Sequence, residues 1–224
     1  MKKIAILVDG GFYKKRAKTL FGEKTPKERA NELFKYCISH VNEPKDPRET
    51  GNELYRIFYY DCYPSQKVFY HPLTKKAVDL HKAPSYSWNM QFFSELTSKR
   101  KVALRMGELL ESDGGFVLSE KATKRLCRGD ITVSDLTEDD FYLDIKQKGV
   151  DMRIGLDISS MAYKRQVDRI VLIAGDSDFV PAAKHARREG IDFILDPMWQ
   201  SIKPSLQEHI DGLETRCPRP TCDL

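Results

Sequence analysis

Three short apolar runs, each ending at or near an aspartate, constrain the fold of this chain more than any other feature. The runs span residues 4–8, 54–60 and 170–174, and the acids that follow them are Asp9, Asp61, Asp176 and Asp178. Continuous apolar runs of this length are typical of strands buried on both faces of a parallel sheet. Each run therefore predicts a buried strand with an acidic end.

Helical patterns alternate with these strands. Apolar residues recur three or four apart in segments 12–21, 26–40, 88–96 and 178–188, and further strands are expected at 101–106 and 191–195. This alternation predicts an α/β fold with a central, mostly parallel sheet covered by helices on both faces. The carboxyl ends of parallel strands share one edge, where ligands bind in such folds. We therefore expect the strand-end acids to cluster.

The length of 224 residues suits one domain with an insertion. We expect that domain at 1–215, the insertion at about 111–140, where charged and turn residues gather, and a tail at 216–224. No run is long enough to span a membrane, and residues 4–8 are too short for a signal peptide, so a cytoplasmic protein is expected. A zinc site at Cys217 and Cys222 is not predicted, because no second pair of ligands completes it.

The Asp176–Ser177–Asp178 turn is the most specific acidic feature. One aspartate is enough to cap the following helix, and a second adds repulsion unless a cation neutralises it. Asp9 alone is equally well explained as a helix cap.

The segment 148–158 fits a strand by its alternation and a helix by the spacing of Ile154, Ile158 and Met161, so periodicity leaves both open. If it is helical, Asp151 lies in the first turn, where negative charge is favourable. Asp157 then lies about 120° around the axis and is a second-tier candidate.

Four motifs in this order resemble the NYN domain family, in its LabA-like group, of the PIN-like nuclease superfamily. They are IAILVDGGFY at 4–13, YYDCY at 59–63, KGVDMRIGLDI at 148–158 and LIAGDSDFVP at 172–181, and the resemblance runs over 3–111 and 141–211. It implies a PIN-like, Rossmann-like three-layer fold in which the KGVD segment opens a helix and the insertion precedes it.

The resemblance also implies a metal-dependent endoribonuclease. By position, Asp9, Asp151, Asp176 and Asp178 are the catalytic residues and hold Mg²⁺ or Mn²⁺, with Asp61, Asp157 and Ser177 as second-tier residues. Carboxylate oxygens without His or Cys suit these hard cations better than zinc. RNA is the expected substrate and single-stranded DNA the alternative.

Basic and aromatic residues near the motifs are candidates for nucleic-acid contacts. We expect this role for Lys148, Tyr13, Lys14, Lys15, Arg16 and Lys184, although Tyr13 fits core packing equally well and basic residues commonly lie on solvated faces. The insertion either extends the substrate groove or forms a homodimer contact.

Other classes of function compete with this one. A haloacid-dehalogenase phosphatase needs an aspartate at the position of Gly11 and is disfavoured. The alternative that remains is a catalytically weak or inactive NYN module that binds nucleic acid or a protein partner.

Overall fold

A computed structural model describes residues 1–42 and 51–220 of the chain. The two prolines and several charges of residues 42–51 predict a loop, and this segment falls almost entirely outside these ranges. The described chain divides into two compact units, and each is described by itself. Unit 1 contains residues 1–62, 91–107 and 149–224, and unit 2 contains residues 63–90 and 108–148.

Unit 1 is built on a parallel sheet. Its strands are β1 (Lys3–Asp9), β2 (Glu53–Cys62), the first part of β5 (Val102–Leu118), β7 (Arg169–Ile173), β8 (Asp192–Asp196) and β9 (Gly212–Leu213). They lie in the order β5-β2-β1-β7-β8-β9, and every neighbouring pair is parallel. All these strands therefore end at one edge, the carboxyl edge. The predicted α/β fold with a mostly parallel sheet is confirmed.

The central strands form the core of unit 1. The side chains of Ile4 through Val8 are completely buried, and those of Ile170 to Ile173 are almost completely buried. Burial of such aliphatic side chains contributes roughly 1.5–3 kcal/mol each. The chain positions at the ends of β1 and β7 are therefore fixed by the best-packed part of the unit.

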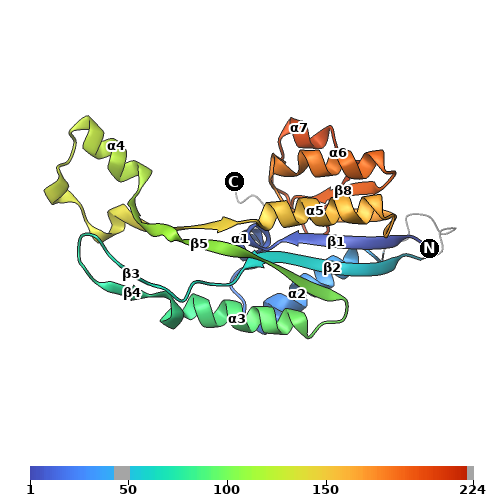
Figure 1. Ribbon diagram of the computed structural model, residues 1–224, viewed down its shortest axis with the longest axis horizontal. Helices are drawn as coiled ribbons and strands as arrows, with labels where there is room; N and C mark the ends of the chain where they lie inside the picture. Colours follow the sequence, from blue (N-terminus) through green and yellow to red (C-terminus); the bar gives the residue numbers. More distant parts are fainter. Residues whose placement is uncertain (43–50, 221–224) are drawn as a thin grey trace. The chain divides into compact units, whose positions relative to one another are not determined.

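Helices cover this sheet. They are α1 (Gly10–Phe21), α2 (Pro26–Ser39), α5 (Val150–Tyr163), α6 (Val180–Arg188) and α7 (Pro204–Gln207), with α3 (Pro84–Thr97) running from unit 2 into unit 1. Figure 1 shows α5 and α6 together on one side of the sheet and α2 on the other.

Local sequence sets the helix ends. Thr25 and Glu28 form a reciprocal capping box at the start of α2, with Pro26 in its first turn. Gly190, with φ +83°, lies just after the end of α6, and its left-handed backbone terminates the helix. The segment that periodicity left open, 150–158, lies in a helix, as the family resemblance implied.

Unit 2 contains the whole of the segment predicted as an insertion. The second part of β5 pairs antiparallel with β6 (Phe141–Lys148), and β3 (Val68–Tyr70) pairs antiparallel with β4 (Ala77–Asp79). Between β5 and β6 lies α4 (Glu120–Arg128), capped by Ser119 and ended by Gly129 in the left-handed region. The strand expected at 101–106 is therefore longer, and a helix occupies part of the segment predicted as an insertion.

In the described parts of the chain, we find no helix whose length and apolar character would let it cross a membrane.

Candidate active site at the carboxyl edge

Asp9 is both the last residue of β1 and the cap of α1. Its Oδ1 accepts a hydrogen bond of 3.1 Å from the backbone N–H of Phe12. Gly10 lets this turn lie directly against β2, because a Cβ at position 10 would come within 2.6 Å of the Tyr59 ring and of the Tyr60 carbonyl oxygen. The Asp-Gly sequence therefore fixes the carboxylate at the end of the central strand.

The surroundings of Asp9 favour its neutral form. Burial raises its pKa from 3.8 to about 6; the hydrogen bond from Phe12 opposes this rise, and the negative charges of Asp151 and Asp61 add to it. Perturbed acids of this kind are concentrated at functional sites. Asp9 is thus held near other carboxylates at a cost in free energy.

Asp151 links Asp9 to the acidic turn. It lies in the first turn of α5, and burial raises its pKa, with further contributions from the charges of Asp176 and Asp178. The four acids named from the sequence are therefore coupled electrostatically, with Asp151 interacting with the other three.

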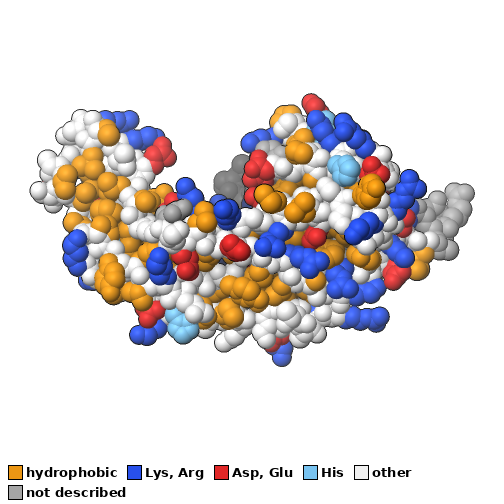
Figure 2. Space-filling model, viewed as in Figure 1, with side chains coloured by type: hydrophobic (Ala, Val, Ile, Leu, Met, Phe, Trp, Pro, Cys, Tyr) orange, Lys and Arg blue, Asp and Glu red, His pale blue; other side chains and the backbone are white. Residues whose placement is uncertain are grey.

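Asp176 and Asp178 lie exposed in the turn between β7 and α6. Oδ1 of Asp176 accepts a hydrogen bond of 3.2 Å from the N–H of Asp178. Gly175 is needed just before them, because a Cβ there would meet the Phe12 ring at 2.6 Å. In Figure 2, acidic side chains gather beside the left end of α6, while Lys and Arg side chains lie over α4 and α6. The side chain of Ser177 lies outside what the structure describes.

Asp61, the acid at the end of β2, already has partners. It is buried, and its carboxylate lies 2.8 Å from Nζ of Lys14. It also accepts hydrogen bonds from the Tyr59 hydroxyl at 3.0 Å and from the backbone N–H of Cys62 at 2.8 Å. Asp61 affects the site through its charge, and Lys14 is committed to neutralising it.

Asp157 faces a different part of the sheet from Asp151. Its Oδ2 accepts hydrogen bonds from the Tyr60 hydroxyl at 2.8 Å and from Nε of Arg105 at 3.0 Å. These contacts to β2 and β5 anchor α5 on the sheet, in agreement with its predicted rotation around the helix axis.

Besides Lys14, two of the predicted nucleic-acid contacts are used inside the fold. Tyr13 is completely buried and its hydroxyl donates to Glu32 at 3.0 Å, in agreement with the core-packing alternative. Arg16 donates from Nε and Nη2 to the carbonyl oxygen of Met198, at 3.2 and 2.6 Å. Lys15, Lys148 and Lys184 are exposed.

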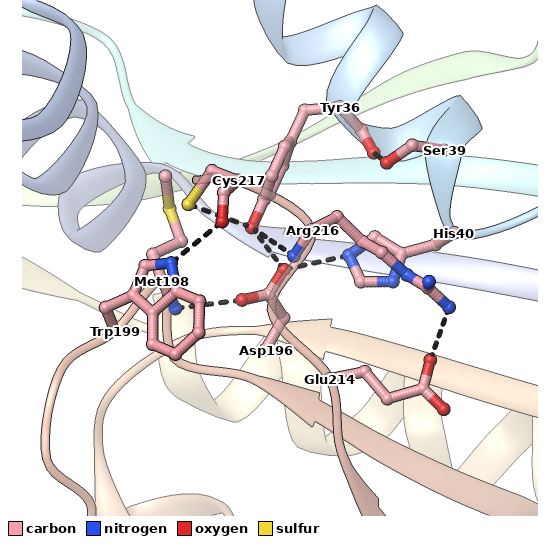
Figure 3. A network of polar contacts seen from close by, with 9 residues as sticks. All are labelled: Tyr36, Ser39, His40, Asp196, Met198, Trp199, Glu214, Arg216 and Cys217. Carbon is pink, nitrogen blue, oxygen red and sulfur yellow. Dashed lines mark hydrogen bonds and ion pairs between the residues drawn. The ribbon is translucent and has the colours of Figure 1, made fainter. Parts of the chain in front are cut away.

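A fifth acid at this edge, Asp196, was missed in the sequence. It ends β8 and is completely buried; its Oδ2 accepts a hydrogen bond of 2.5 Å from the Tyr36 hydroxyl and lies 2.8 Å from Nε2 of His40. Its Oδ1 accepts from the N–H of Met198 at 2.8 Å (Figure 3). Its place at a strand end could have been predicted, since Asp196 directly follows the strand expected at 191–195.

The donor chemistry of the edge fits a hard divalent cation. Asp9, Asp151, Asp176 and Asp178 offer carboxylate oxygens whose mutual repulsion a cation would relieve. As placed, however, no three Asp, Glu, His or Cys side chains within residues 1–42 and 51–220 converge closely enough to form a metal site. The edge is an acidic, electrostatically coupled surface.

The parallel sheet and its acidic edge define an α/β domain of the PIN-like class. Residues 118–212 match the family model of the NYN domain, in agreement with the predicted family. A NYN domain is a nuclease-type domain. The match covers Asp151, Asp176 and Asp178, and it also includes residues 118–140 of the segment predicted as an insertion.

The other comparisons add little. The chain is similar to a crystal structure of a protein of unknown function from Vibrio parahaemolyticus, with 16% identity, 96% of this chain and 92% of the other covered, and a TM-score of 0.47. No curated protein matches the chain.

Proposed function

We propose that the protein is a metal-dependent endoribonuclease whose substrate binds at the carboxyl edge. The observation that carries this proposal is the coupling of Asp9, Asp151, Asp176 and Asp178, which come from three separate segments. Keeping like charges together costs free energy, and a bound divalent cation would offset that cost.

In this mechanism the four acids would hold Mg²⁺ or Mn²⁺. When bound, such a cation would supply an activated water and stabilise charge at the scissile phosphate. Asp9 contributes from a fixed position, since it is tied to Phe12 and followed by Gly10, which lies against Tyr59. Asp176 and Asp178 contribute from an exposed turn that an incoming phosphate can reach. Lys15, Lys148 and Lys184 are the remaining candidates for contacts to the nucleic-acid backbone.

The test is cleavage of end-labelled single-stranded RNA, duplex RNA and single-stranded DNA with Mg²⁺, with Mn²⁺ or with EDTA. We expect cutting of RNA that needs the metal and falls at least about 100-fold in Asp176→Asn/Asp178→Asn. Asp192→Asn is the matched control, because Asp192 begins β8 at the opposite edge and pairs with Arg169 at 2.7 Å. Equal loss in the control variant would contradict the proposed site.

A NYN module without catalysis is the second candidate. It is favoured by the observation that, in the described part of the chain, three metal-binding side chains do not converge. Metal-saturated, folded protein that binds RNA yet cuts none of the substrates would select this alternative. The predicted homodimer stays a prediction, which the mass of the protein in solution tests.

A further inference from the structure

Trp199 is the most unusual side chain at the carboxyl edge outside the acidic cluster. It lies three residues beyond β8 and is 42% exposed, although a large indole is normally covered. Its backbone has φ +64° and that of Met198 has φ +46°. Non-glycine residues in this region cost about 1–3 kcal/mol each and persist only where the surroundings hold them.

The surroundings hold this ring in one position (Figure 3). Nε1 of Trp199 donates to the Cys217 carbonyl oxygen at 2.8 Å. The N–H of Met198 is bound by buried Asp196, and its carbonyl oxygen accepts two hydrogen bonds from Arg16. An aromatic ring fixed before its ligand arrives loses little conformational entropy on binding.

The position of Trp199 places it beside the acidic turn. Ile173 of β7 pairs with Asp196 of β8, so Asp176 and Trp199 each lie three residues beyond the same register point. Neighbouring strands are about 4.8 Å apart. The side chain of Gln200 lies against Gly175, with its Nε2 3.0 Å from where a Cβ of that glycine would be.

The ring also borders a cleft suited to a nucleoside. This cleft has a volume of about 820 Å³ and is lined by Pro197, Trp199, Gln200, Ser201 and residues 212–216. The guanidinium of Arg219 lies 5.7 Å from the centre of the indole ring. Within the cleft, the carboxylate of Glu214 is paired with the guanidinium of Arg216 at 2.7 Å.

We propose that Trp199 is a stacking platform for a base of single-stranded nucleic acid, with Arg219 at the adjacent phosphate or base. Aromatic and guanidinium groups bind single strands in this way, and bases in a duplex are not accessible to them. This inference rests on the proposed function, since it assigns the cleft to the strand that crosses the acidic turn. It predicts a preference for single strands over duplexes.

The test measures binding without cleavage. All variants carry Asp176→Asn/Asp178→Asn, which prevents cleavage. They also carry Trp88→Phe, so that Trp199 is the one tryptophan left of the two in the chain. We expect a short oligo(U) RNA to quench the Trp199 fluorescence saturably and duplex RNA not to. Binding followed by a label on the RNA should weaken about 10- to 100-fold in Trp199→Leu, which keeps apolar cover, and much less in Trp199→Phe. Thermal unfolding of each variant reports whether the fold is intact.

The outcomes separate this inference from the proposed function. Unquenched fluorescence, or equal RNA affinity in a folded Trp199→Leu variant, would overturn the stacking platform, as would failure of any oligonucleotide to bind. Metal-dependent cleavage by the protein with native acids would then still support the nuclease. Quenching by oligo(U) without any cleavage by that protein would keep the platform and reject the nuclease.

Discussion

Aspartate side chains on the flanks of the carboxyl edge, at the ends of β2 and β8, have different surroundings from the aspartate at its centre, at the end of β1. On the flanks, Asp61 is paired with Lys14 and Asp196 is bound by Tyr36 and His40. In the centre, Asp9 accepts hydrogen bonds from the backbone of its own turn, among them that of Phe12, and burial raises its pKa to about 6, with other acids nearby.

This difference separates two roles for buried acids. A carboxylate whose oxygens are all bound by protein donors organises the elements that supply those donors. A carboxylate surrounded by other carboxylates destabilises the fold and has capacity left for a cation. Substitutions on the flanks should therefore lower stability, while a neutral isostere in the centre should raise it.

The largest effect is expected for Asp196→Ala. This change leaves the Tyr36 hydroxyl, the Met198 N–H and Nε2 of His40 without their acceptor inside the protein. Each unsatisfied buried group costs about 1–3 kcal/mol, so the free energy of unfolding should fall by at least about 3 kcal/mol. Urea unfolding measures it. Asp192→Asn, on the same strand but half-buried, should cost no more than about 1 kcal/mol, and equal losses would remove the distinction.

A smaller loss is expected for Lys14→Met. The variant keeps the aliphatic stem but leaves the buried carboxylate of Asp61 without its cation, although the Tyr59 hydroxyl and the Cys62 N–H remain. We expect a loss of about 2–3 kcal/mol in urea unfolding. Lys15→Met, at the exposed neighbouring position, should stay within about 0.5 kcal/mol. If both variants are equally stable and both bind RNA poorly, Lys14 is a nucleic-acid contact after all.

Asp9→Asn should act in the opposite direction. Asparagine keeps the cap on Phe12 but removes the charge. A folded-state pKa raised from 3.8 to about 6 means that the folded protein binds this proton more tightly than the unfolded chain, so wild-type stability falls as the pH rises through this window. The full cost above pH 6 is at most roughly 3 kcal/mol.

The measurement for Asp9 is urea unfolding at several pH values in EDTA. The variant should be about 1–3 kcal/mol more stable than the wild type at pH 7, and the difference should vanish near pH 4. A variant that is less stable at pH 7 would show that Asp9 belongs with the bound acids of the flanks.

Strand ends were predictable from the sequence because burial and chain direction are both local signals. The apolar run before Asp9 predicts a buried strand, and parallel pairing then brings Asp9 and the acidic turn to one edge. The same rule applied to 191–195 would have identified Asp196. The partners of Asp196 carry no such signal, since Tyr36 and His40 come from α2, about 160 residues earlier in the chain.

The directions in which side chains point could not be predicted from the sequence either. Tyr13 and Lys14 follow Asp9 in the motif, yet one ring is packed against α2 and the adjacent amine neutralises Asp61. Helix α4 was also not predicted, although Ser119 and Gly129 supply its start and stop signals, because charged residues mask its apolar face.

The place of β1 in the sheet has a consequence for synthesis of the chain. β1 is synthesised before the other strands of the sheet, but its second neighbour, β7, begins only at Arg169. A nascent chain therefore carries this apolar strand with one open edge until β7 has been made, and such edges pair readily with other chains. Pairings this distant in sequence also slow folding. Cotranslational chaperones are expected to bind this strand, and the acidic edge to form only after release.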